Sequence, residues 1–294
     1  MRSSFATRSL VIILALAGSL GLSACSAVKL GYNALPSLAY FWLDGYVDFS
    51  DEQAPRVRDE IANLHAWHRQ QELPRVLELL ARMEQLAPGE ISPQQACTVV
   101  GELQERIRAV TDRIEPGAVA LAATLTGREQ RHMARKFRRR NETFQKDWVA
   151  LSRAELVDKR FGQALERMET IYGRLDDPQR ALLRQRLEQS AFDPARTLGE
   201  WQRRQQDLLE TVRRISHGRG LSEAEARALL RGWVARIEKA PDAGYRAYQE
   251  TLLQEGCTTF SLVHQSTSAA QREQAVRRLR AYQRDVRDLI AQQP

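Results

Sequence analysis

The chain has 294 residues, of which 44 are Lys or Arg and 37 are Asp or Glu, giving a formal net charge of +7. Because the two signs are interspersed, this composition argues against a nucleic-acid-binding protein and favours a solvated helical surface. Strong helix formers such as Arg, Gln, Leu, Ala and Glu dominate, and runs typical of β-strands are nearly absent. The composition therefore predicts an all-α fold.

The beginning of the chain has the pattern of a secretory signal peptide. Arg2 and Arg8 precede an apolar run over residues 9–22. This run is shorter than the roughly 20 apolar residues that cross a bilayer. The run ends in four residues that resemble the bacterial lipobox: Leu22, Ser23, Ala24 and Cys25. The alternatives are an ordinary signal peptide with a chance cysteine, or an uncleaved anchor.

The lipobox resemblance implies cleavage before Cys25 and acylation of its sulfur and its amine. Two or more acyl chains hold a protein stably on a bilayer, whereas one holds it marginally. Ser26, at a position where aspartate usually retains such proteins in the inner membrane, implies sorting to the periplasmic face of the outer membrane. Removal of the two leader arginines lowers the net charge from +7 to +5. We expect a signal peptide over 1–24, a lipidated membrane-proximal segment over 25–50 and a helical periplasmic domain over 51–294.

Residues 31–49 contain six aromatic side chains and follow Cys25 with no Gly/Ser-rich tether. The folded body should therefore lie close to the membrane. Two interpretations of the aromatic residues remain open. Tyr and Trp are favoured at bilayer interfaces, but aromatic residues also dominate protein cores, and core packing is the interpretation we favour.

Helical periodicity continues through the rest of the chain. Six apolar residues spaced four or three apart between Ala96 and Ile114 form one continuous seam. Residues 128–175 contain no proline and predict one long helix, or two nearly collinear helices that meet at Gly162. We expect an elongated bundle of about eight or nine helices with one long central helix.

The starts of several helices are also predicted, from capping boxes or from proline at the first helical position. They lie at Ser92, Thr126, Asp177, Asp193, Ser222 and Ser268.

Cys97 and Cys257 are the two cysteines that remain once Cys25 is acylated. In an oxidising periplasm an even pair is a candidate disulfide. Both lie on apolar stripes, so two separate buried thiols are the alternative.

A basic stripe is predicted on the helix that begins near residue 128. Met133 and Phe137 lie on its apolar face, so the basic residues point outward. Such a stripe could bind phospholipid, lipopolysaccharide or an acidic envelope protein, or be a solvated face paired with acids of neighbouring helices. The stripe consists of Arg128, Arg131, Arg135, Lys136, Arg138 and Arg139.

Motifs of enzymes, cofactor sites and metal sites are missing from the sequence. There is no nucleophile elbow, phosphate loop or zinc-protease motif. His65 and His68 share a helix face, but a metal site needs three or four converging ligands. We therefore expect no catalytic residues, no cofactor and no metal, and no nucleic-acid partner.

Several segments together resemble an uncharacterised family of proteobacterial lipoproteins that contain a domain of unknown function. The likeness lies in the lipobox, in YNALPSLAYFWLDGYVDFSDEQ and WHRQQELPR, in ERMETIYGRLDDPQ, and in the basic Arg/Gln helix. It implies a lipid-anchored helical protein and supplies no activity. A weaker likeness to membrane-anchored lipase-specific foldases rests on the all-α, Arg/Gln-rich character. We expect a non-enzymatic outer-membrane lipoprotein with a structural or interaction role, or alternatively a foldase-like or chaperone-like carrier of an envelope client.

Overall fold

The computed structural model describes residues 23–218 and 220–292, with side chains from residue 27 onward. The expected signal peptide over 1–22 lies outside these residues, as do the side chains of Ser23, Ala24, Cys25 and Ser26.

The described part of the chain is all-helical, which confirms the predicted fold class. Counting each π-helical turn with the α-helices it continues gives ten helical segments, close to the eight or nine predicted. The elements are α2 (Ser23–Val47), α3 (Gln53–Trp67), a π-helical turn (His68–Glu72), α4 (Leu73–Leu86), α5 (Pro93–Ala122), α6 (Gly127–Phe144), a second π-helical turn (Gln145–Val149), α7 (Arg153–Tyr172), α8 (Asp177–Glu188), α9 (Pro194–His217), α10 (Glu223–Glu238), α11 (Ala243–Gln265) and α12 (Ala269–Ala291).

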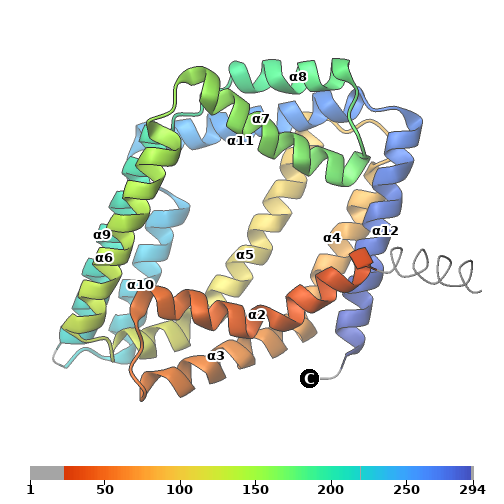
Figure 1. Ribbon diagram of the computed structural model, residues 1–294. Helices are drawn as coiled ribbons and strands as arrows, with labels where there is room; N and C mark the ends of the chain where they lie inside the picture. The colour runs from red at the N-terminus through yellow and green to blue at the C-terminus, as the bar shows by residue number, and fades with distance from the viewer. Residues whose placement is uncertain (1–22, 219, 293–294) are drawn as a thin grey trace, which may run out of the picture.

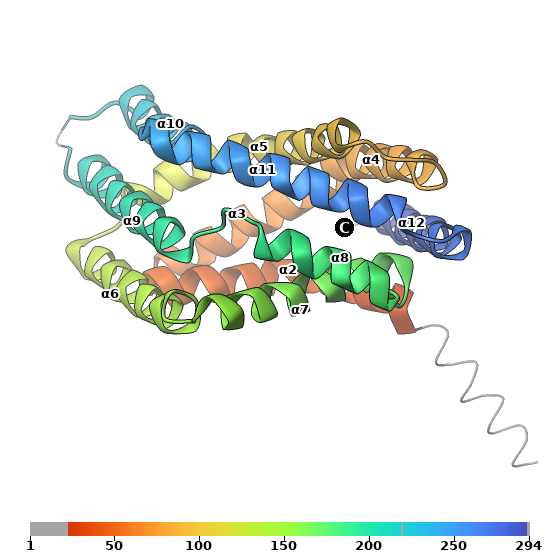
Figure 2. The ribbon, with the colours of Figure 1, turned by 90° about the horizontal axis from the view of Figure 1, so that it is seen from above.

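The helices form a closed frame, which differs from the elongated bundle that we expected (Figure 1). α2 and α3 make one side, α6, α9 and α10 the next, α7, α8 and α11 the third, and α4 and α12 the fourth. The longest helix, α5, has 30 residues and crosses behind the frame. Seen from above, α2, α6 and α7 lie on one face of the molecule and α4, α5, α10 and α11 on the other (Figure 2). We call the first of these the front face, since it faces the reader in Figure 1.

Most of the predicted helix starts are confirmed, because a capping side chain satisfies backbone N–H groups that have no partner within the helix. Capping boxes begin α6 at Thr126, α10 at Ser222 and α12 at Ser268. Proline follows the N-caps of α5 and α9, Ser92 and Asp193. The prediction for α8 was wrong by one residue, because Asp176 and not Asp177 accepts the hydrogen bond from the Gln179 amide.

The predicted long helix over 128–175 was wrong. The chain turns between α6 and α7, and Gly162, the expected junction, lies inside α7. Ser152 makes a capping box with Glu155, which starts a new helix there. Phe144 stacks on Trp148 at 5.8 Å between ring centroids and also contacts Trp201 at 4.5 Å. These aromatic contacts hold the turn against α9.

Buried apolar residues form separate clusters along the sides of the frame. One lies among α5, α6, α9 and α10, and a second among α4, α7, α8, α11 and α12. A third cluster joins α2 to α4 and α12, because Tyr32 of α2 packs with Leu73 of α4 and Leu289 of α12. Lys29 also donates to Asp288 at 2.7 Å, so that α2 and α12 close the frame.

Candidate functional surfaces

Helix α2 has one face inside the protein and one outside. Tyr40 and Val47 are each 7 % exposed, and the Arg58 guanidinium of α3 lies 3.5 Å from the centroid of the Tyr40 ring. The opposite side carries a set of exposed large apolar side chains: Val28, Leu30, Leu35, Leu38, Phe41 and Trp42. We call this set the apolar face of α2.

The aromatic segment is therefore divided between the two interpretations that the sequence left open. Tyr32, Tyr40 and Phe49 contact other parts of the fold, as expected for a packed element. Phe41 and Trp42, in contrast, are 68 % and 59 % exposed. Large apolar side chains gathered on one exposed helix face mark an interaction surface.

The basic stripe on α6 is exposed and for the most part has no acidic partner. Arg128 is the exception, because it pairs with Asp48 and with the buried Glu129. Among the residues that the structure describes, no carboxylate lies within 4.0 Å of the four remaining arginines. The prediction that neighbouring acids pair with the stripe is thus wrong at Arg131, Arg135, Arg138 and Arg139, which we call the open arginines.

Lys136 differs from these arginines because it turns toward α2. Its amino group lies 5.6 Å from the centroid of the Tyr46 ring, a distance at which a cation is attracted to the ring face. Tyr46 also contacts Phe137 at 5.8 Å and Trp42 at 4.8 Å. Through these contacts the C-terminal half of α2 packs along α6.

The helices that carry the apolar face and the open arginines, α2 and α6, contact each other and lie on the front face (Figures 1 and 2). The open arginines lie on the side of α6 opposite the buried Met133, since at about 100° per residue all four project about 140–240° around the helix from it. In a helix that lies in a membrane interface one helix carries both the apolar strip and the cations, whereas here the apolar face belongs to α2 and the open arginines to the neighbouring α6.

The two histidines of the sequence motif join α3 to α2. The Tyr32 hydroxyl lies 3.0 Å from Nδ1 of His68, and the Tyr32 carbonyl oxygen lies 3.1 Å from Nε2 of His65. Burial lowers the pKa of both imidazoles. Within 23–218 and 220–292, no three His, Cys, Asp or Glu side chains converge as metal ligands would.

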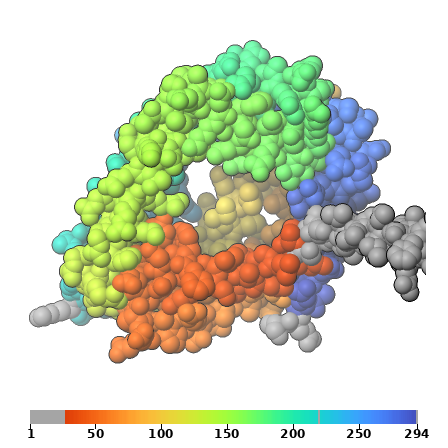
Figure 3. All heavy atoms as spheres, in the orientation of Figure 1, coloured from red at the N-terminus to blue at the C-terminus, as the bar shows by residue number. Residues whose placement is uncertain are grey.

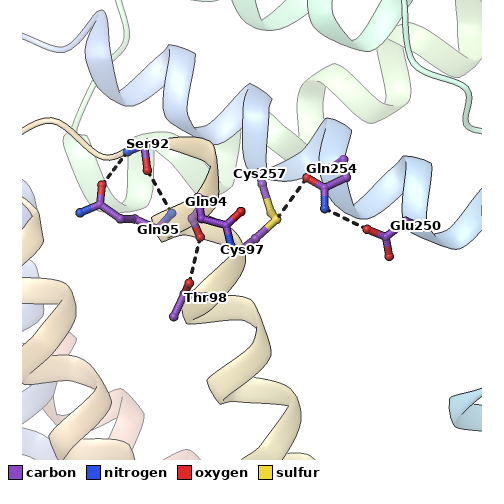
Figure 4. The surroundings of a disulfide bond; sticks show 8 residues. All are labelled: Ser92, Gln94, Gln95, Cys97, Thr98, Glu250, Gln254 and Cys257. Carbon is purple, nitrogen blue, oxygen red and sulfur yellow. Dashed lines mark hydrogen bonds between the residues drawn. A yellow bond between two sulfur atoms is a disulfide. The ribbon is translucent and has the colours of Figure 1, made fainter.

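Cys97 and Cys257 form the predicted disulfide, with 2.02 Å between the sulfur atoms and 5.4 Å between the Cα atoms. The bond joins the first turns of α5 to the middle of α11 (Figure 4). Beside it, the Ser92 amide donates to Gln95 Oε1 at 2.8 Å and completes the cap of α5. Cys257 is 3 % exposed, so both its apolar surroundings and its bond fit the sequence-based prediction.

A hollow lies at the centre of the front face (Figure 3). It is bordered by α2, α6, α7 and α12, and α5 crosses at its back. Leu103, Ile107 and Ile114 of α5 are 50 %, 60 % and 42 % exposed, although they belong to the apolar seam that the sequence marked for packing. Sequence reasoning missed this feature, since a buried and an uncovered seam have the same periodicity.

None of the helices in the described part of the chain combines the length and the apolar character that a membrane span requires. This finding covers α2, whose charged and aromatic contacts with α3, α6 and α12 were described above.

Comparison with known proteins identifies the family but gives no activity. No curated protein and no solved structure matches the chain. A family of unknown function (DUF6279) matches residues 45–231, which include α3, α5 and the basic stripe on α6. Because the match covers more than half of the sequence, the chain belongs to this family of unknown function.

Proposed function

We propose that the protein is a lipid-anchored, non-enzymatic component of the bacterial cell envelope, held on the periplasmic face of the outer membrane. Acyl chains on Cys25 fasten it, and the front face of α2 and α6 rests on the bilayer. The observation that carries the proposal is the position of the exposed apolar face, which begins at Val28 in the same helix as Cys25.

The geometry supports contact along the helix. α2 has 25 residues and is about 37 Å long at 1.5 Å per residue. Attachment at its first turn brings the helix to the bilayer, where an apolar face buries about 5–10 Å into the interface. The open arginines on the neighbouring helix would contact lipid phosphates, each adding on the order of 1 kcal/mol near an anionic surface.

A second candidate function is a carrier of an envelope client. The observation that favours it is the hollow, because exposed apolar residues at the back of a concave surface offer a site for an apolar ligand. Both functions can belong to one protein, since the anchor holds the body on the membrane and the hollow remains within the frame.

Binding to vesicles tests the docking face without the lipid anchor. Residues 25–294 carrying Cys25→Ala should bind vesicles that contain phosphatidylglycerol, measured by cosedimentation. Leu38→Asp with Phe41→Asp should weaken this partitioning at least tenfold, because both side chains are exposed and charges resist burial in the interface. Reversing the charge of the four open arginines should remove the dependence on anionic lipid.

The control adds the same two carboxylates to the opposite face of the molecule. Thr98→Asp with Thr251→Asp, both at exposed positions on α5 and α11, should bind as the parent does. Equal weakening by both pairs of substitutions would contradict docking through α2. In cells, a palmitate analogue should label the wild type and not Cys25→Ala, and an unlabelled wild type would refute the lipid anchor.

A further inference from the structure

Helix α5 presents a different chemistry on each of its sides. One side contacts α11 and α10, through the disulfide and the ion pair between Arg231 and Glu115. Another contacts α4, where Arg82 pairs with Glu102. Of the two sides that remain, one is polar, and the other carries Leu103, Ile107 and Ile114.

The apolar side of α5 faces the hollow. At its upper end Val100 helps to line a cavity of about 270 Å³ together with Ile171 of α7 and Leu279 of α12. At its lower end Ile114 helps to line a second cavity, of about 540 Å³, together with Leu43 of α2. Leu103 and Ile107 form an apolar strip on α5 between the two cavities. Since α2, α7 and α12 border the hollow, this strip lies at the back of the hollow. We call the two cavities and this strip the trough.

The upper cavity is lined almost entirely by carbon. Its walls come from five helices, and its one side-chain hydroxyl, that of Tyr172, is hydrogen-bonded to His264 at 2.8 Å. A peptide entering it would bury backbone N–H and C=O groups without partners, which costs several kcal/mol for each group. Apolar cavities of about 150 Å³ stay dry and bind small hydrocarbons, and this one is larger.

The lower cavity combines apolar walls with charged side chains at its rim. Arg56, Arg113 and Glu60 line it, and within the described chain no carboxylate lies within 4.0 Å of either guanidinium. Its lining therefore carries a net positive charge. From Val100 to Ile114, α5 rises about 21 Å at 1.5 Å per residue. One lipid chain spans roughly 15 Å in half of a bilayer core, so the trough is long enough to hold such a chain.

We propose that the trough binds one single-chain anionic amphiphile. Its hydrocarbon tail lies on Leu103 and Ile107 with its end in the upper cavity, and its anionic group lies beside Arg56 and Arg113 in the lower one. A fatty acid and a lysophospholipid share this chemistry. This inference rests on the second candidate function, that of a carrier, and does not depend on the lipid anchor or on the apolar face of α2.

Binding of palmitate and of lysophosphatidylglycerol to the Cys25→Ala protein tests the proposal. Native mass spectrometry should show one ligand per chain, and displacement of a dansyl fatty acid gives the affinity. Leu103→Glu with Ile107→Glu should weaken binding of both ligands at least tenfold, because each substitution places a carboxylate in the apolar strip. Thr98→Glu, on the polar side of α5 about 140° from Leu103, is the matched control and should bind normally.

Two further variants examine the ends of the trough. A side chain built at Gly256, on the wall of the upper cavity, meets no atom within 4 Å, so Gly256→Leu should fold and obstruct the tail. Gly162→Leu, at an equally open position on α7, is its control. Arg113→Gln should weaken palmitate several-fold and leave hexadecanol unchanged, since the uncharged alcohol makes no ion pair.

The outcomes separate this proposal from docking on the membrane. Normal palmitate binding by Leu38→Asp with Phe41→Asp supports the trough, and loss of binding in that variant would place the ligand on α2 and overturn it. Absence of binding to the parent protein, or equal affinity for the trough variants and their controls, would also overturn it. If palmitate alone binds, the ligand is a fatty acid, and if lysophosphatidylglycerol alone binds, the trough requires the phosphate head.

Discussion

At the scale of single residues, His264 shows how a buried titratable group is held neutral. Its side chain is fully buried, and Nε2 lies 2.7 Å from the Gly89 carbonyl oxygen, which can only accept. Nε2 therefore carries the proton, and Nδ1 accepts from the Tyr172 hydroxyl at 2.8 Å. Burial lowers the pKa of His264, and burial also raises the pKa of Tyr172 to about 12.

This arrangement predicts a loss of stability in mild acid. The unfolded chain binds protons on its histidines near pH 6.5, whereas burial lowers the pKa of His264, His65 and His68 in the folded protein, so that these imidazoles take up protons only at a lower pH. The contribution of these histidines to the free energy of unfolding is thus fully present above about pH 6.5. It is lost as the pH drops toward their pKa values in the folded protein. Urea denaturation at pH 7.5, 6.5 and 5.5 should show this decline, with a shallower slope for His264→Gln.

The control for this prediction is His217→Gln, because His217 is exposed at the end of α9. It should keep the slope of the parent. A slope that His264→Gln leaves unchanged would show that the buried imidazole is not the group that titrates.

At the scale of helices, the chain's local signals explain where elements begin. Residues such as Ser222 and Ser268 can satisfy the first amide groups of a helix from within a few residues, so their role is visible in the sequence. The Ser152–Glu155 capping box is equally visible in the sequence, and it starts a new helix within the proline-free stretch that predicts one long helix or two collinear ones. The direction of the turn between α6 and α7 was not predictable, because distant residues such as Trp201 hold it.

The disulfide supports a contact between two helices that are far apart in sequence. It closes a loop across 160 positions, and the chain-entropy model gives it about 5 kcal/mol of stabilisation. Replacing Cys97 and Cys257 together by Ala should therefore lower the denaturant midpoint, and dithiothreitol should lower the midpoint of the wild type but not of the double variant. A wild-type midpoint that is insensitive to complete reduction would contradict this expectation.

At the scale of the whole molecule, closure of the frame depends on the packing of α12 against α2 and α4. Leu289 is 1 % exposed within this cluster. Leu289→Ala should lower the free energy of unfolding by about 2–5 kcal/mol. Hydrogen exchange should then speed up first in α2 and α4, because these helices lose the contact that closes the frame.

Leu183→Ala provides a matched comparison. Leu183 is also 1 % exposed, but it belongs to the second cluster, among α4, α7, α8, α11 and α12, which contains no described residue of α2. A similar loss of stability is expected, with faster exchange in α7 and α8 and not in α2. The same exchange pattern in both variants would mean that the frame opens as one cooperative unit.

The sequence by itself determined the all-α fold, most helix starts, the pair of cysteines that bond and the outward direction of the basic stripe. Each depends on residues within a few turns of one another, or on the small number of cysteines. The tertiary structure alone decided which apolar seams stay uncovered. Periodicity places Phe41 and Trp42 on one side of α2, and Leu103 and Ile107 on one side of α5, but the arrival of a neighbouring helix depends on contacts between distant parts of the chain. The closed frame leaves both sides open, because α3 packs on the other side of α2, and α4 and α11 on the other sides of α5.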